Sequence, residues 1–190
     1  MNYYIRILSA ACLTLFIVSN VSNVFADNTS IAMDKRSFIR QVSSPLINLP
    51  NCQVPFDGVL TGGQPTFDQI KQAAETGFKV VINLRTDNEL PDPDQELTWV
   101  EGCGMKYIHI PVSVPEGLSP QNTKVFAEAL SKPENYPLIV HCKSGNRVGA
   151  MFALKAFYID EKDIDEALLI GERAGLTKLS PAVRKILERY

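Results

Sequence analysis

Apolar residues follow two alternating patterns along this 190-residue chain. Short runs rich in β-branched residues are typical of strands that are covered on both faces of a sheet. Such strands are expected at 58–60, 79–84, 105–111 and 138–140. Between these runs apolar residues recur at helical spacing, and capping residues or prolines mark several helix starts. Helices are expected at about 66–76, 94–101, 119–131, 148–158, 161–174 and 180–188.

The regular alternation of strands and helices predicts an α/β protein. Strands that are joined by helical crossovers pair in parallel, and the crossovers are right-handed. We therefore predict three layers, with a central, mostly parallel sheet of four to five strands flanked by helices. In such sheets ligands bind where the carboxyl ends of the strands meet. Three predicted loops leave that edge, at 85–93, 113–118 and 142–147.

The third loop places a cysteine in a setting that favours reaction with anions. Cys142 lies between the strand at 138–140 and the helix at 148–158. The first amides of a helix lack internal partners, and together with the helix dipole they attract negative charge. Because such positive potential stabilises a thiolate, we expect Cys142 to be a nucleophile. The planar guanidinium of Arg147 can grip two oxygens of a tetrahedral oxyanion.

The other residues of this loop support the same interpretation. Gly145 lets the backbone turn inward, and Lys143 adds positive charge. His141, directly before the cysteine, is expected to fix the loop through hydrogen bonds. The expected phosphate-binding set comprises His141, Lys143, Ser144, Gly145, Asn146, Arg147 and Val148.

The sequence HCKSGNR resembles the phosphate-binding loop of cysteine-dependent protein phosphatases, in which His-Cys is followed by five residues, Arg and then Ser or Thr. Here four residues separate Cys142 from Arg147, and Val148 replaces the hydroxyl residue. With TGGQPT (61–66), VVINLR (80–85) and YIHIPV (107–112), the shortened loop is similar to the bacterial beta-lactamase-hydrolase-like protein phosphatase family.

This resemblance extends from about Val59 to the C-terminus. It implies a cysteine phosphatase-like fold and a hydrolase of the tyrosine- or dual-specificity type. The implied substrate is a phosphorylated protein or a small phosphate ester, which passes through a cysteinyl-phosphate intermediate.

The resemblance also implies a general acid, which protonates the oxygen of the leaving group. The resembling phosphatases carry an aspartate for this purpose on the loop after the strand that precedes the nucleophile strand. That loop reads VSVPEGL here, and Glu116 is its only acidic residue. Asp87, Glu89 and Asp92 in the earlier loop are alternatives, of which Asp87 is preferred.

Two other functions are compatible with the same loop. A six-residue loop also resembles the persulfide loop of rhodanese sulfurtransferases, in which Cys142 would carry the transferred sulfur. Rhodaneses usually have an aspartate where Asn83 stands, and the sequence before Ser119 lacks their glycine-alanine signature. The other alternative is a non-catalytic phosphate-binding module, which would keep the loop but lack a working acid. Phosphate ester hydrolysis remains the favoured function.

The N-terminus has the pattern of an export signal. Arg6 precedes an apolar run at 7–18, which is short for a membrane span, and Val24-Phe25-Ala26 suits signal peptidase. We expect residues 1–26 to be removed, with export to the periplasm or the medium and no stable insertion in the membrane.

The remaining chain is expected to consist of a polar tail at 27–51 and a phosphatase-like domain at 52–190. The whole chain has a formal net charge of −2 and contains no strongly basic stretch. Nucleic acid is therefore not an expected partner. The sequence does not predict an oligomeric state.

Three cysteines follow the predicted cleavage site. In an oxidising compartment the economical assignment pairs Cys52 with Cys103 and leaves Cys142 free. The alternative is that Cys52 and Cys103 are both buried and reduced. His109 and His141 are the only histidines, and neither has a cysteine or histidine partner at the spacing of a zinc site. No metal or other cofactor is expected.

Overall fold

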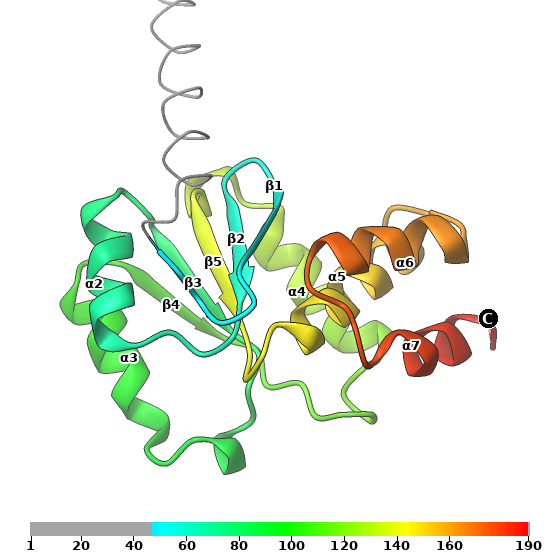
Figure 1. Ribbon diagram of the computed structural model, residues 1–190, viewed down its shortest axis with the longest axis horizontal. Coiled ribbons are helices and arrows are strands. Elements are labelled where there is room, and N and C mark those ends of the chain that lie inside the picture. Colours follow the sequence, from blue (N-terminus) through cyan, green and yellow to red (C-terminus); the bar gives the residue numbers. More distant parts are fainter. Residues whose placement is uncertain (1–46, 190) are drawn as a thin grey trace, which may run out of the picture. The chain divides into compact units, whose positions relative to one another are not determined.

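The computed structural model describes residues 47–189, which form a sheet between two layers of helices (Figure 1). The strand order is β1-β2-β5-β3-β4. β1 (Gln53–Phe56) is antiparallel to β2 (Val59–Gly62). The other neighbours are parallel and include β5 (Leu138–His141), β3 (Val80–Asn83) and β4 (Lys106–His109). The prediction of a three-layer α/β fold with four to five mostly parallel strands is confirmed.

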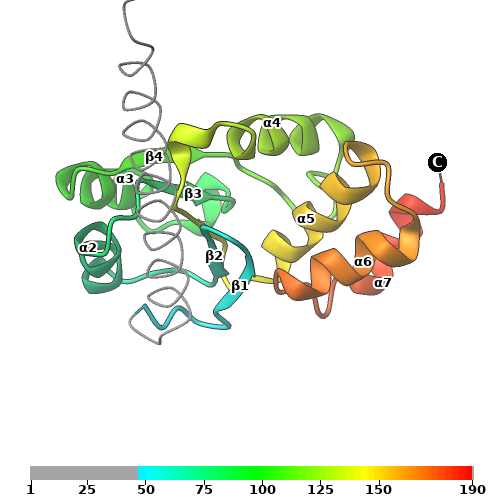
Figure 2. The ribbon, with the colours of Figure 1, turned by 90° about the horizontal axis from the view of Figure 1, so that it is seen from above.

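The helices are divided between the two faces of the sheet. Helices α2 and α3 cover one face, whereas α4, α5, α6 and α7 lie on the other (Figure 2). Their bounds agree with the predicted ranges to within about three residues at each end: α2 (Phe67–Glu75), α3 (Pro93–Gly102), α4 (Pro120–Leu130), α5 (Asn146–Tyr158), α6 (Ile164–Arg173) and α7 (Ser180–Leu187). Two short 3₁₀ helices, η1 (Asp87–Glu89) and η2 (Pro133–Asn135), lie in the connections.

The central strands are apolar because helices cover both of their faces. In β3, Val80 and Ile82 pack in the cluster that includes α4 to α7, whereas Val81 packs in the cluster of α2 and α3. Asn83 and His141 are fully buried polar exceptions. Both lie at the carboxyl ends of their strands, where a ligand site is expected.

Strand β1 was not predicted from the sequence. Pro55 interrupts its apolar pattern, and proline lacks the amide that a central strand requires. β1 lies at the edge of the sheet and pairs with β2 alone, so Pro55 is tolerated there.

The described chain begins within the predicted tail. Ile47 and Leu49 are buried and pack in the cluster of α2 and α3, so the core includes the end of that segment. The predicted signal at 1–26 and the tail up to residue 46 lie outside the described residues. Within 47–189, no helix is both long and apolar enough to cross a membrane.

The predicted disulfide between Cys52 and Cys103 is wrong, because both residues are free thiols. Each is half-buried against the cluster of α2 and α3, where it packs as a small apolar side chain. The sulfur of Cys52 lies 3.7 Å from the carbonyl oxygen of Ile47. Burial raises the pKa of the Cys52 thiol, which keeps this thiol protonated.

Candidate active site

Cys142 lies in the turn between β5 and α5 and is 1% exposed. The turn closes at Gly145, whose φ of 86° lies in the left-handed region that favours glycine. The Gly145 amide donates a hydrogen bond to the sulfur of Cys142 over 3.2 Å. The sulfur is therefore aligned with the start of α5, where the unpaired amides of the first helical turn favour an anion.

The end of β2 forms the floor of this loop. The Cys142 amide donates to the Gly62 carbonyl over 3.3 Å, and the Gln64 amide donates to the Lys143 carbonyl over 3.4 Å. A Cβ atom on Gly63 would lie 2.9 Å from the Lys143 carbonyl oxygen. The glycines of the TGGQPT segment thus allow two backbones to approach closely.

Arg147 is held by three hydrogen bonds but keeps two donors for a ligand. Its Nη1 donates to the Leu84 carbonyl over 2.7 Å and to Glu89 Oε2 over 2.8 Å. Its Nη2 donates to Glu89 Oε1 over 2.9 Å. Within the described residues, its buried Nε has no hydrogen-bond partner. Because Nε and the outer hydrogen of Nη2 share one edge of the guanidinium, that edge can bind two oxygens of an anion.

Glu89 orients Arg147 and is ionised at neutral pH. Its hydrogen bond with Arg147, opposed in part by desolvation, lowers its pKa to about 2. A carboxyl group that ionises at such low pH is not suited to donate a proton near neutral pH. Glu89 is therefore not the general acid in this arrangement.

A buried carboxylate that the sequence analysis did not single out lies behind the loop. Glu96 of α3 is 4% exposed. Its Oε1 lies 2.9 Å from His141 Nε2 and accepts a hydrogen bond from Gln64 Nε2 over 3.1 Å. Its Oε2 accepts from Asn83 Nδ2 over 2.7 Å. Glu96 therefore contacts residues at or just beyond the carboxyl ends of β2, β3 and β5.

Arg85 connects this carboxylate to Arg147. Its Nη1 donates to Gln64 Oε1 over 2.7 Å, and its Nη2 donates to the main-chain carbonyl of Glu89. Polar contacts thus run without interruption from Glu96 through Gln64, Arg85 and Glu89 to Arg147.

Not every predicted binding residue directs its side chain to the anion position. Lys143 and Ser144 are exposed. The side chain of Asn146 accepts the Thr177 amide over 2.8 Å and so holds the segment after α6. Val148 is fully buried in the core, which explains why an apolar residue stands there.

Asp92 caps the start of α3, where its Oδ1 accepts a hydrogen bond from the Asp94 amide over 3.0 Å. The two preferred candidate acids lie in different surroundings. Glu116 is exposed and lines a shallow hollow with Tyr158 and Ile186. Asp87 is also exposed, and its Oδ1 lies 3.7 Å from Nδ1 of His109.

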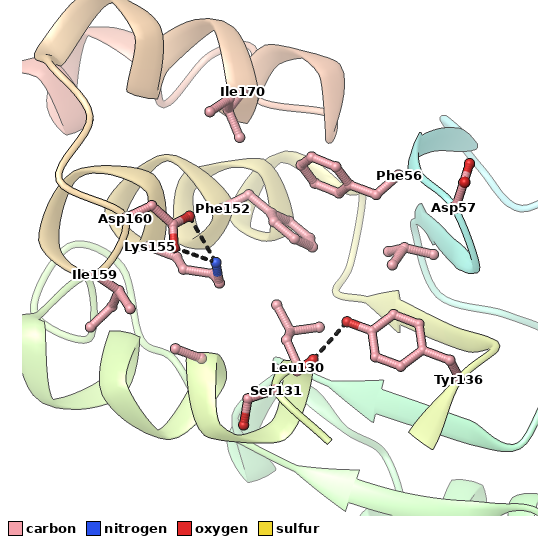
Figure 3. A pocket seen from close by; sticks show the side chains of 12 residues that line it. Phe56, Asp57, Leu130, Ser131, Tyr136, Phe152, Lys155, Ile159, Asp160 and Ile170 are labelled. Atoms are coloured by element: carbon pink, nitrogen blue, oxygen red, sulfur yellow. Dashed lines mark hydrogen bonds and ion pairs between the residues drawn. The ribbon is translucent and has the colours of Figure 1, made fainter. Parts of the chain in front are cut away.

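A cavity of about 420 Å³ lies at the other end of α5 from the cysteine (Figure 3). Phe56, Tyr136 and Phe152 line it, and Lys155 at its edge is paired with Asp160 over 2.8 Å. These residues lie toward the amino ends of β2 and β5, so the cavity is separate from the loop of Cys142.

The fold and the cysteine loop define a protein of the cysteine phosphatase-like class. The family model described as "DSP-PTPase phosphatase fused to NAD+ Kinase" matches residues 56–180, and the chain belongs to this family. The description of this family names a phosphatase.

Two curated relatives confirm the resemblance noted from the sequence. The beta-lactamase hydrolase-like protein of Xylella fastidiosa (strain Temecula1) is 30% identical over 116 residues, or 60% of this chain and 26% of that protein. Its namesake from Agrobacterium fabrum (strain C58) is 33% identical over 95 residues, or 48% of this chain and 22% of that protein. The matches span about a quarter of the length of these relatives.

Solved structures share the fold at lower identity. The core catalytic domain of the PP-IP phosphatase SIW14 from S. cerevisiae has a TM-score of 0.60 and 17% identity, covering 76% of this chain and 88% of that chain. The active form of Tk-PTP has a TM-score of 0.55 and 24% identity, covering 74% of this chain and 97% of that chain. These likenesses show the fold alone.

Proposed function

We propose that this protein hydrolyses phosphate monoesters, as a tyrosine- or dual-specificity-type phosphatase, through a cysteinyl-phosphate intermediate. The observation that carries the proposal is the hydrogen bond from the Gly145 amide to the sulfur of Cys142, in the same loop as the free edge of Arg147. A thiolate accepts such a bond better than a thiol does, and thiolates are the nucleophilic form of cysteine.

The reaction proceeds in two displacements at phosphorus. The Cys142 thiolate attacks, a phosphorus–sulfur bond forms, and the bond from phosphorus to the ester oxygen breaks. Water then attacks the cysteinyl-phosphate, which releases inorganic phosphate and restores the thiolate. In both steps charge spreads over three equatorial oxygens, which the loop amides and the Nε–Nη2 edge of Arg147 stabilise.

The leaving oxygen needs a proton, and we assign Glu116 as its donor with Asp87 as the competing candidate. The loop of Glu116 begins close to the site, because Val112 donates its amide to the same Leu84 carbonyl that anchors Arg147. The Glu116 carboxylate then accepts a proton from the attacking water in the second step.

The protein is further proposed to act outside the cytoplasm after removal of residues 1–26. The motivation is the apolar run at 7–18 followed by Val24-Phe25-Ala26. N-terminal sequencing of the natural protein should read Asp27 first, and an intact Met1 would contradict this assignment.

The reaction is tested by assaying an aryl phosphate and the thiosulfate–cyanide pair side by side. Cys142→Ser should lower phosphatase turnover by about 10⁴-fold or more, yet still bind inorganic phosphate. Cys103→Ser, which alters a free thiol elsewhere, is the matched control and should leave turnover unchanged. Arg147→Lys should lose about 10²- to 10³-fold, because an ammonium cannot replace a two-donor edge.

Three outcomes would overturn the proposal. Full phosphatase activity in Cys142→Ser would exclude the cysteinyl-phosphate. Accumulation of a Cys142 persulfide from thiosulfate, without hydrolysis of phosphate esters, would establish the rhodanese alternative. Phosphate binding without turnover of either substrate would indicate a non-catalytic phosphate-binding module.

A further inference from the structure

We propose that Glu96 is a positioning residue for the phosphatase reaction and acts on Cys142 through His141. This inference rests on the proposed function, since it assumes that Cys142 is the nucleophile. Glu96 does not lie in the cysteine loop but on α3, on the opposite face of the sheet from α5.

The burial of Glu96 is the first argument. A carboxylate that leaves water loses several kcal/mol of hydration, and partners must offset that loss. Apolar side chains of similar size often replace buried ion pairs without loss of stability, so packing alone does not require a glutamate here. Its contacts with Gln64, Asn83 and His141 instead direct both carboxylate oxygens toward the edge that holds the cysteine loop.

The first branch of contacts reaches the nucleophile directly. The His141 ring is fully buried, with Nε2 at 2.9 Å from Glu96 and Nδ1 at 3.4 Å from the carbonyl oxygen of Cys142. The Glu96 contact with Nε2 is an ion-pair approach that lacks the geometry of a hydrogen bond, and it places a carboxylate against the edge of the ring opposite the Cys142 carbonyl. By fixing the ring, Glu96 fixes the backbone at Cys142 and hence the direction of its sulfur toward the Gly145 amide.

The second branch reaches the arginine of the loop. The side-chain nitrogen of Gln64 donates a hydrogen bond to Glu96, so its side-chain oxygen faces Arg85 and accepts a hydrogen bond from it. With the amide reversed, Arg85 would face a second donor and lose its acceptor. Glu96 thus selects the orientation of Gln64 on which the contacts of Arg85 with Glu89 depend.

The decisive variant is Glu96→Gln, which keeps the shape but turns one carboxylate oxygen into a donor that faces other donors. We expect kcat/KM to fall about 10- to 100-fold, as when groups that orient an active-site ligand are lost. The rate at which iodoacetate alkylates Cys142 in the unreacted enzyme should fall as well. Glu101→Gln, on an exposed position of the same helix, should stay within about twofold of wild type for both rates.

A spectroscopic measurement separates positioning from a general loss of structure. The chain has only two histidines, so Nε2 of His141 can be assigned by comparing ¹⁵N spectra of wild type and His109→Gln. In wild type the His141 signals should be those of a ring that lies against a carboxylate, and Glu96→Gln should shift them while Glu101→Gln leaves them in place. The wild-type spectrum decides the contact even if Glu96→Gln does not fold.

The outcomes distinguish this inference from the proposed function. Unchanged alkylation in a folded Glu96→Gln protein, or a wild-type His141 spectrum without a carboxylate contact, would overturn the positioning role. If the wild type hydrolyses no phosphate ester, the proposed function fails. Slower alkylation and shifted His141 signals in Glu96→Gln would still establish that Glu96 positions Cys142.

Discussion

The two sides of Cys142 are built in different ways. On one side, the β5–α5 turn brings the cysteine, the glycine amide and Arg147 together within six consecutive residues. On the other side, the polar groups come from the β2–α2 connection, the β3–α3 connection and α3, and they meet through hydrogen bonds between residues distant in sequence: Gln64, Arg85, Glu89 and Glu96. A short motif can thus supply the charge and the nucleophile of a site, whereas their orientation depends on distant polar groups.

The β5–α5 turn, residues 142–147, is called the turn side below. Its position depends on how closely α5 packs on α6. A Cβ atom at Gly149 would lie 2.0 Å from the amide nitrogen of Leu176 and 2.6 Å from the carbonyl oxygen of Gly171. Both are backbone atoms, which cannot move as a flexible side chain can. The start of α5, and with it the cysteine loop, is therefore held by direct backbone contact.

Disrupting the contact of Gly149 with the backbone of Gly171 and Leu176 should have the largest effect on the free energy of unfolding. Gly149→Ala should lower the free energy of unfolding by about 3 kcal/mol or more, at the upper end of the cost of overpacking. Gly102→Ala is the matched control, because a Cβ atom at that helical glycine meets no atom within 4 Å. It should change stability by less than about 0.5 kcal/mol. Urea denaturation measures both values, and equal stability of the two variants would show that α5 is not held in this way.

The sequence was sufficient for the turn side because its information is local. A buried strand, a glycine in a turn and a helix start follow one another, so Cys142, Gly145 and Arg147 could be placed from their spacing alone. The same holds for the central strands and the helices. Strand β1 could not be predicted because it contains Pro55. The pattern of apolar residues does not show that this strand lies at the edge of the sheet, where a proline is tolerated.

The carboxylate side could not be predicted for a physical reason. Glu96 lies 32 positions from Gln64 and 13 from Asn83. A glutamate on a helix is ordinarily solvated, and only the packing of α3 on the sheet buries this one. Likewise, Asn146 looked like an anion ligand in the motif, although it holds the backbone at Thr177. One weak signal was present, since Asn83 and His141 are polar residues at the ends of apolar strands.

Loss of the general acid should have the next largest effect, and both preferred candidates, Glu116 and Asp87, lie outside the turn. Glu116→Gln should slow esters with poor leaving groups about 100-fold, since these need a proton, and leave activated aryl esters nearly unchanged. Asp87→Asn should slow both kinds by less than about twofold. Steady-state rates over a series of leaving groups measure the difference. Equal slowing of all esters by Glu116→Gln would remove Glu116 as the acid, and selective slowing by Asp87→Asn would assign the role to Asp87.

The smallest expected effect on stability comes from the ion pair between Glu89 and Arg147. The lowered pKa of Glu89 determines how this contribution changes with pH. The pKa of Glu89 is lowered from 4.5 to about 2 in the folded protein. Since the folded state binds this proton more weakly than the unfolded state, the pair stabilises above about pH 4.5, and the stabilisation is lost as the pH falls toward 2. The Glu89 side chain is 26% exposed, so solvent screening reduces the contribution to about 2 kcal/mol.

Glu89→Gln should therefore lower the free energy of unfolding by about 2 kcal/mol at pH 7. The difference from wild type should shrink between pH 4.5 and pH 3, because the Glu89 carboxyl of the unfolded wild type takes up a proton over this range. Glu101→Gln, which removes an exposed carboxylate, should show no comparable change with pH. Urea denaturation of wild type, Glu89→Gln and Glu101→Gln at pH 7 and at pH 3 measures the differences in free energy of unfolding. A difference that stays constant down to pH 3 would mean that the Glu89 carboxylate is not paired with Arg147 in solution. Arg147 would then owe its orientation to the Leu84 carbonyl, and the KM for phosphate esters should be the same in Glu89→Gln as in wild type.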